Sequence, residues 1–100
     1  MNAAERWLLF AREDLRAAEV LFREDVFSLS CFHAQQAVEK ALKATLSFMN
    51  SEQGLPKTHS ISELASRLGD LRTQFPEGLD ELDSFWGAPG FPGHEGGEVE

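Results

Sequence analysis

Four polar side chains of a kind that binds anions recur in the middle of the chain at helical spacing. His33, Gln36, Lys40 and Lys43 follow one another at steps of three, four and three residues, so a helix would place them on one face. An imidazole, an amide and two ammonium groups can hold a phosphate or a nucleotide through charge-assisted hydrogen bonds. The same spacing also suits ordinary ion pairs on a solvated helix, such as Glu39 with Lys43, and both interpretations stay open.

Two further polar residues, His59 and Asp14, are candidates to join that face. His59 precedes a predicted helix start, where it can donate a proton, bind an anion with Lys57, or simply pack against the helix. Asp14 falls on an otherwise apolar helical stripe, where an isolated carboxylate would be costly to bury. We therefore expect Asp14 to pair with Lys40 or a neighbouring polar group, as a structural contact that fixes helix register or as a functional one.

The well-known catalytic and cofactor motifs do not occur in the sequence. There is no P-loop and no Gly-x-Gly-x-x-Gly segment, and the His94-Glu95 stretch lacks the second His of a zinc-binding motif. Cys31 and His33 are two residues apart, so on a helix they point in different directions and cannot form a nucleophile–base pair. We therefore assign no catalytic residue, no metal ligand and no cofactor.

Two long helices are expected to carry most of these polar side chains. Residues 4–24 place apolar side chains at steps of three and four, with Asn2 as the expected N-cap. The buried stripe predicted for this helix consists of Trp7, Ala11, Leu15, Ala18 and Leu21 or Phe22. Residues 27–50 are apolar over a wider arc, which is typical of a central helix packed on several sides. The short link between these helices predicts an antiparallel hairpin.

Shorter helices and an irregular tail are expected after the hairpin. Gly54 and Pro56, which disfavour a helix, predict a loop at 50–58. Helices are predicted over about 60–72 and 76–86. Residues 87–100 hold five of the eight Gly. The expected fold class is all-α, an up-and-down helical bundle built on a long antiparallel helix hairpin plus two shorter helices. Its helical domain covers residues 1–86, and a Gly- and Pro-rich irregular C-terminal tail covers 87–100.

Charge and cysteine content limit the classes of partner. The net charge is −8, and residues 51–100 hold three Lys or Arg against ten Asp or Glu, which would repel a phosphate backbone. Broad nucleic-acid binding is therefore not expected, and any anion site should be local to the first half. No apolar run approaches the length of a membrane span. The single Cys31 cannot form an internal disulfide, so the expected location is the cytoplasm, with no membrane association.

One segment carries a resemblance to a known family. Residues 31–44 read CFHAQQAVEKALKA, after a first helix that carries Trp7 and Asp14 and before a His59-Ser60-Ile61 segment. This order resembles the HEPN domain family over roughly residues 5–70. The resemblance implies an up-and-down helical bundle that is often a homodimer. It also implies frequent pairing with a minimal nucleotidyltransferase, in toxin–antitoxin or enzyme–accessory systems.

The sequence departs from the catalytic members of that family. Some members are metal-independent RNases with an Arg-x4–6-His motif at a dimer interface, whereas others are proposed nucleotide-binding subunits. No Arg stands five to seven residues before His33, His59 or His94, so this chain lacks the motif. The family usually adds a further C-terminal helix, and we expect the apolar face that it covers to be covered by a second copy or left bare.

The favoured function is a HEPN-like nucleotide-binding or accessory module rather than an enzyme. It would act as a homodimer with a minimal nucleotidyltransferase partner, in a toxin–antitoxin-like pair. Its expected nucleotide- or anion-binding residues are His33, Gln36, Lys40, Lys43 and His59. One alternative is a metal-independent RNase toxin whose divergent site uses His33, His59 and Lys40 for acid–base cleavage. The other alternative is a degenerate structural or interaction protein.

Overall fold

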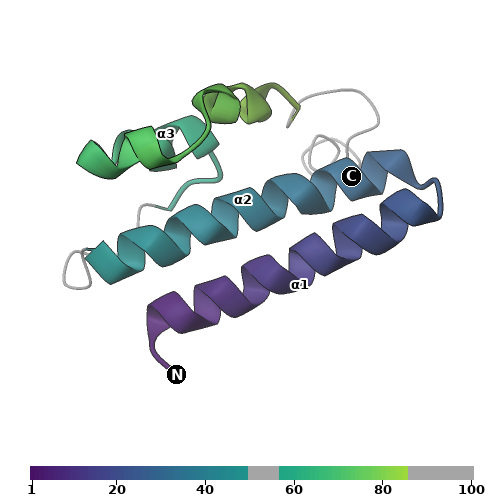
Figure 1. Ribbon diagram of the computed structural model, residues 1–100, viewed down its shortest axis with the longest axis horizontal. Helices are drawn as coiled ribbons and strands as arrows, with labels where there is room; N and C mark the ends of the chain where they lie inside the picture. The colour runs from purple at the N-terminus through teal and green to yellow at the C-terminus, as the bar shows by residue number, and fades with distance from the viewer. Residues whose placement is uncertain (50–56, 86–100) are drawn as a thin grey trace.

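A computed structural model describes residues 1–49 and 57–85, and every regular element in these ranges is helical. The elements are α1 (Ala3–Arg23), α2 (Phe27–Met49), α3 (Ile61–Ser66) and two 3-10 helices, η1 (Gly69–Gln74) and η2 (Glu77–Phe85). Figure 1 shows α2 in the middle, with α1 along one side and the shorter helices along the other. The predicted all-α fold class is confirmed. The expected tail at 87–100, and residues 50–56 of the expected loop, lie outside the described residues.

Local capping explains where the hairpin helices begin and end. Asn2 Oδ1 accepts the backbone N–H of Glu5 at 2.8 Å, and the Glu5 carboxylate accepts the backbone N–H of Asn2 at 3.0 Å. This capping box satisfies two N–H groups that the first turn of a helix leaves unpaired. At the far end Asp25 has a φ of 66°, a left-handed conformation that Asp tolerates better than most residues. The Val26 N–H then bonds to the Leu21 carbonyl at 2.9 Å, which closes the turn into α2.

Small residues form the contact between α1 and α2. Ala11 and Ala18 on α1 are buried, as are Ala37 and Ala44 on α2, and Ser30 Oγ donates to the Ala18 carbonyl at 2.7 Å. Because alanine side chains are short, the two helices can approach closely along a narrow stripe. Leu15, which was expected on this stripe, is instead exposed. Of the two alternatives for the end of the stripe, Leu21 is half-buried and Phe22 is exposed. A narrow Ala stripe is enough where α1 packs on α2, so the larger apolar residues beside it remain outside the contact.

The main apolar core lies on the opposite side of α2. It is formed by residues of α2, α3, the α3–η1 junction and η2, namely Leu42, Leu46, Ile61, Leu64, Ala65, Leu68 and Leu79. Val38, Phe75 and Leu82 pack against it from the edge. Since this core fills one flank of α2 and α1 covers another, α2 is the central helix that its wide apolar arc predicted.

The third helix is shorter than predicted. The sequence indicated a helix to about residue 72, but α3 ends at Ser66 and the chain turns at Gly69, which has a φ of 61°. Glycine adopts this left-handed conformation without steric cost, so it permits the turn that separates α3 from η1. The predicted fourth helix is a 3-10 helix, η2, from Glu77 to Phe85.

A carboxylate from η2 holds the start of α3. Asp83 accepts the backbone N–H groups of Ile61 at 2.7 Å and Ser62 at 2.9 Å, and the Ser60 hydroxyl at 2.9 Å. Burial raises the pKa of Asp83, but the hydrogen bonds from Ser62, Ile61 and Ser60 outweigh it, so the pKa lies below its ordinary value of 3.8. This contact fixes η2 against α3 and sets the position of the segment that carries His59.

Candidate functional site

Asp14 is the centre of a polar cluster between α1 and α2. Its Oδ2 lies 2.6 Å from Lys40 Nζ, and its Oδ1 lies 2.8 Å from His33 Nδ1, with the Asp14 side chain only 12% exposed. Asp14 comes from α1, whereas His33 and Lys40 lie two turns apart on α2. Because an ionised carboxylate only accepts hydrogen bonds, His33 Nδ1 must carry the proton.

Glu39 is the centre of a second cluster, between α2 and the segment that precedes α3. Its side chain is 4% exposed, and its Oε2 lies 3.0 Å from both Lys43 Nζ and His59 Nδ1. A carboxylate this deeply buried requires such partners, because an unpaired charge at that depth would be strongly destabilising. His59, in contrast, is 65% exposed, so its ring reaches from the buried Glu39 to the surface.

Two aromatic side chains of α1 lie against the two lysines. The Lys43 ammonium is 5.1 Å from the centre of the Trp7 ring, and that of Lys40 is 6.0 Å from the centre of the Phe10 ring. The two rings contact each other edge to face at 6.3 Å. Each lysine is therefore held between a carboxylate and an aromatic ring, an arrangement that restricts its rotamers and adds a cation–π attraction.

Gln36 lies between the two clusters on the same side of α2. Its amide oxygen is buried and, among the described residues, has no hydrogen-bond partner. A buried acceptor of this kind costs free energy unless a donor reaches it. We call these residues together the polar face: Asp14, His33, Gln36, Glu39, Lys40, Lys43 and His59.

The structure brings the predicted residues together in two groups rather than one. Lys40 and His33 meet Asp14, whereas Lys43 and His59 meet Glu39. Glu39 was considered only as a neighbour of Lys43, and its central place was not predicted. A signal was available, because Glu39 interrupts the wide apolar arc of its helix just as Asp14 interrupts the stripe of the first helix.

The charges of the polar face balance. Two carboxylates face two ammonium groups, so with neutral histidines the net charge of these residues is zero. Each ammonium has three N–H donors, of which one is directed to a carboxylate, and each histidine can take up a proton. The arrangement can therefore donate hydrogen bonds in a fixed geometry and exchange protons. Within residues 1–49 and 57–85 no group of three His, Cys, Asp or Glu side chains is placed to hold a metal ion.

The fold and the polar face define a small all-α domain built on a helix hairpin with a polar cluster along its central helix. The model of the HEPN domain family matches residues 4–87, which is most of the chain. The chain belongs to the HEPN domain family. No curated protein and no solved structure shows significant similarity to it. In the part of the chain that the structure describes, none of the helices has the length and apolar character needed to cross a membrane.

Proposed function

We propose that this chain is a HEPN-type nucleotide-binding or accessory module whose ligand contacts the polar face. The observation that carries the proposal is that Asp14 and Glu39 each hold one lysine and one histidine along the same side of α2. Donors held in place before binding lose little conformational entropy when a phosphate arrives. A phosphate oxygen can then become a further acceptor for the ammonium groups of Lys40 and Lys43.

Membership in the HEPN family supports the wider part of the proposal. The module would act in the cytoplasm as a homodimer, beside a minimal nucleotidyltransferase and in a toxin–antitoxin-like pair. The single free Cys31 is compatible with a reducing compartment. Sedimentation velocity tests the homodimer, which requires a species of twice the 11.1 kDa mass of one chain.

Calorimetric titration of ATP into the full chain tests nucleotide binding. A simple Lys40→Ala substitution would leave Asp14 without its cation, so loss of binding could reflect loss of fold. The better variant combines Asp14→Asn with Lys40→Gln, which removes the ammonium and its counter-charge while keeping polar side chains of similar size. Arg67→Gln is the matched control, because Arg67 is a surface cation that pairs with Glu63 outside the polar face.

We expect wild type and Arg67→Gln to bind ATP equally, and the double variant to bind at least about tenfold more weakly. Circular dichroism and thermal unfolding of all three proteins establish that they are folded. The proposal is wrong if folded wild type gives no heat at millimolar ATP, or if the double variant binds as tightly as wild type.

The histidine geometry favours RNA cleavage as a second candidate function. His33 and His59 each place Nδ1 within hydrogen-bonding distance of a buried carboxylate, a pairing that orients a histidine ring for acid–base chemistry. Cleavage of a labelled single-stranded RNA tests this candidate. His33→Ala and His59→Ala, purified in parallel to control for contaminating nucleases, should each lose the activity. Equal cleavage by all three preparations would eliminate this candidate.

A further inference from the structure

Two aromatic residues of α1, Trp7 and Phe10, lie directly beside the ammonium groups of the polar face. The Lys40 ammonium lies over the Phe10 ring at 6.0 Å from its centre, and the Lys43 ammonium lies over the Trp7 ring at 5.1 Å. The two rings meet edge to face, with their planes at 87°. Aromatic surface and phosphate-binding groups are therefore close enough for one ligand to contact both.

The Phe10 ring is the more open part of this aromatic pair. Phe10 is 39% exposed, whereas the side chains of Lys40 and Asp14 beside it are 27% and 12% exposed. An exposed aromatic residue is common by itself, but the contacts with Trp7 and Lys40 hold this ring in place. A flat group that packs on Phe10 therefore meets a surface that is already ordered.

A nucleotide supplies the two chemical groups that this surface can hold. Its base is a flat π-system that stacks on aromatic side chains, and its phosphates accept hydrogen bonds from ammonium groups. The base and the phosphates are joined through a single ribose, so a base on Phe10 keeps its phosphates near Lys40 and Lys43. A phosphate ligand without a base would use only the lysines.

Charge favours a free nucleotide over a nucleic acid strand as the ligand. The chain has a net charge of −8, and residues 51–100 hold three Lys or Arg against ten Asp or Glu. A strand that extends beyond the polar face would bring further phosphates towards this negative charge. A mononucleotide keeps its few phosphates beside the lysines.

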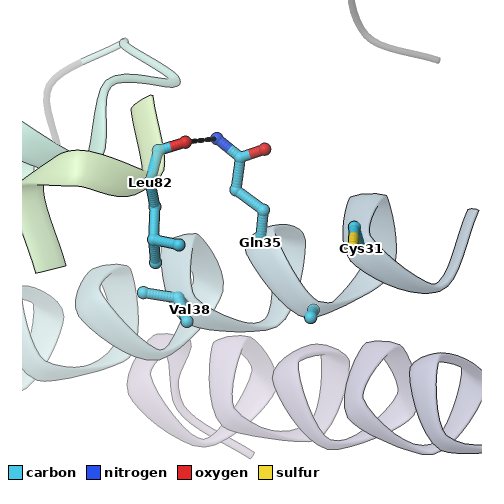
Figure 2. Close-up of a pocket in the computed structure, with 5 residues that line it drawn as sticks. Cys31, Gln35, Val38 and Leu82 are labelled. Atoms are coloured by element: carbon cyan, nitrogen blue, oxygen red, sulfur yellow. Dashed lines mark hydrogen bonds between the residues drawn. The ribbon is translucent and has the colours of Figure 1, made fainter. Parts of the chain in front are cut away.

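A hollow between α2 and η2 is the competing place for an aromatic base (Figure 2). It has a volume of about 200 Å³ and is lined by Cys31, Ala34, Gln35, Val38 and Leu82. None of these lining residues is a cation, and the Gln35 Nε2 already donates to the Leu82 carbonyl at 3.0 Å. A base in this hollow would leave its phosphates without an ammonium group, so the Phe10 ring is the better match.

We propose that Phe10 and Trp7 form the base-binding part of the nucleotide site, with the base stacked on Phe10 and the phosphates on Lys40 and Lys43. This inference rests on the proposed nucleotide binding at the polar face. It adds the residues that distinguish a nucleotide from other phosphate ligands.

A comparison of ATP with inorganic tripolyphosphate tests the proposal on the full chain by isothermal titration calorimetry. Tripolyphosphate has three linked phosphates and no base, so it reports phosphate binding alone. Phe10→Leu removes the aromatic ring but keeps an apolar side chain. Phe22→Leu is the matched control, because Phe22 is an exposed ring of the same helix that contacts Phe27 instead. Ala34→Leu fills the hollow of Figure 2.

The ratio of ATP affinity to tripolyphosphate affinity is the quantity to compare. In Phe10→Leu this ratio should fall at least about fivefold from its wild-type value, because base stacking is lost. The affinity of Phe10→Leu for tripolyphosphate should stay within about twofold of wild type, since both lysines remain. Phe22→Leu and Ala34→Leu should keep the wild-type ratio.

The emission of Trp7 gives an independent measurement. Trp86→Phe leaves Trp7 as the only tryptophan in the sequence. With excitation at a wavelength that adenine does not absorb, ATP should quench this emission and tripolyphosphate should not, because only ATP brings a base to the rings. Equal quenching by the two ligands would contradict the role of Trp7.

The proposal is overturned if Phe10→Leu, folded by circular dichroism, keeps the wild-type ratio. The phosphate site on Lys40 and Lys43 would then stand without a base-binding part. It is also overturned if Ala34→Leu lowers the ratio and Phe10→Leu does not, because the base would then occupy the hollow. If folded wild type binds neither ligand at millimolar concentration, nucleotide binding at the polar face is wrong and this inference is wrong with it.

Discussion

Removal of the Asp14 carboxylate is the most direct test of how the helix hairpin is held together. Asp14→Ala deletes the acceptor of two charge-assisted hydrogen bonds, from Lys40 Nζ at 2.6 Å and from His33 Nδ1 at 2.8 Å. Both donors belong to α2 and the acceptor to α1, so the substitution removes a contact between helices and leaves the backbone of each helix unaffected.

The size of the effect follows from the burial of the three side chains. Hydrogen bonds to a charged group contribute about 1.5–3 kcal/mol each when buried, whereas exposed ion pairs contribute about 0–1 kcal/mol. Asp14 is nearly buried, but Lys40 is 27% exposed and can be rehydrated after the carboxylate is lost. We therefore expect Asp14→Ala to lower the free energy of unfolding by about 2–3 kcal/mol, and the melting temperature by about 10–20 °C.

A double-mutant cycle isolates the contribution of the pair. Urea unfolding followed by circular dichroism is measured for wild type, Asp14→Ala, Lys40→Met and the double variant. We expect a coupling energy of about 1–2 kcal/mol between Asp14 and Lys40. The surface pair of Glu63 and Arg67, at 3.8 Å with both side chains about half exposed, serves as the control and should couple by less than about 0.5 kcal/mol.

The coupling energy also shows how the reasoning could fail. If Asp14 and Lys40 couple no more strongly than Glu63 and Arg67, the Asp14–Lys40 pair does not hold the two helices together. A loss of stability in Asp14→Ala without coupling to Lys40 would instead assign the effect to His33 alone.

Three further predictions concern the cap, the core and the first turn. Asp83→Asn should lower the free energy of unfolding by about 1–2 kcal/mol at pH 7. Because the folded pKa of Asp83 lies below 3.8, its stabilisation is present above that value and is lost as the pH falls through the lowered pKa. The difference in unfolding free energy between wild type and Asp83→Asn should therefore narrow in urea unfolding as the pH falls below 3.8. Leu64→Ala, in the fully buried core, should cost about 2–5 kcal/mol in the same assay, whereas Leu71→Ala, at an exposed position, should cost less than about 1 kcal/mol. Asn2→Ala removes the capping box and should cost about 1 kcal/mol in thermal unfolding, and an unchanged melting temperature would contradict that role.

Local patterns were sufficient to predict the hairpin. The apolar spacing placed both long helices within one residue of their observed bounds, and Asn2 caps the first helix as expected. These features depend on residues three or four apart, whose relation on a helix is fixed by its geometry. The break after Ser66 was missed because one glycine at position 69 gives only a weak local signal.

Contacts between distant segments could not be read from local spacing. The Asp83 carboxylate caps a helix that starts 22 residues earlier in the chain, and nothing in either segment alone indicates the match. The Glu39 cluster is similar, because His59 reaches it only after the chain has folded back along α2. Asp14 could be anticipated to need a partner because a carboxylate on an apolar stripe is informative by itself, and the hairpin leaves few cations within reach.

Consecutive residues of the hairpin supply its two surfaces. On α1, Asp14 contributes to the polar face, and Leu15 contributes to an apolar groove lined by Leu8, Leu15, Ala34 and Ala41 among others. On α2 the same holds for Lys40 and Ala41. Neighbouring residues on a helix point about 100° apart, so the line of contact between α1 and α2 separates the two surfaces. If α1 turned about its own axis by about 100°, Leu15 would take the place of Asp14 beside Lys40. The Lys40 ammonium would then be left without its carboxylate partner, which is costly at a partly buried position. The Asp14–Lys40 pair therefore acts on both surfaces at once, because the rotation that it prevents would disrupt the polar face and the groove together.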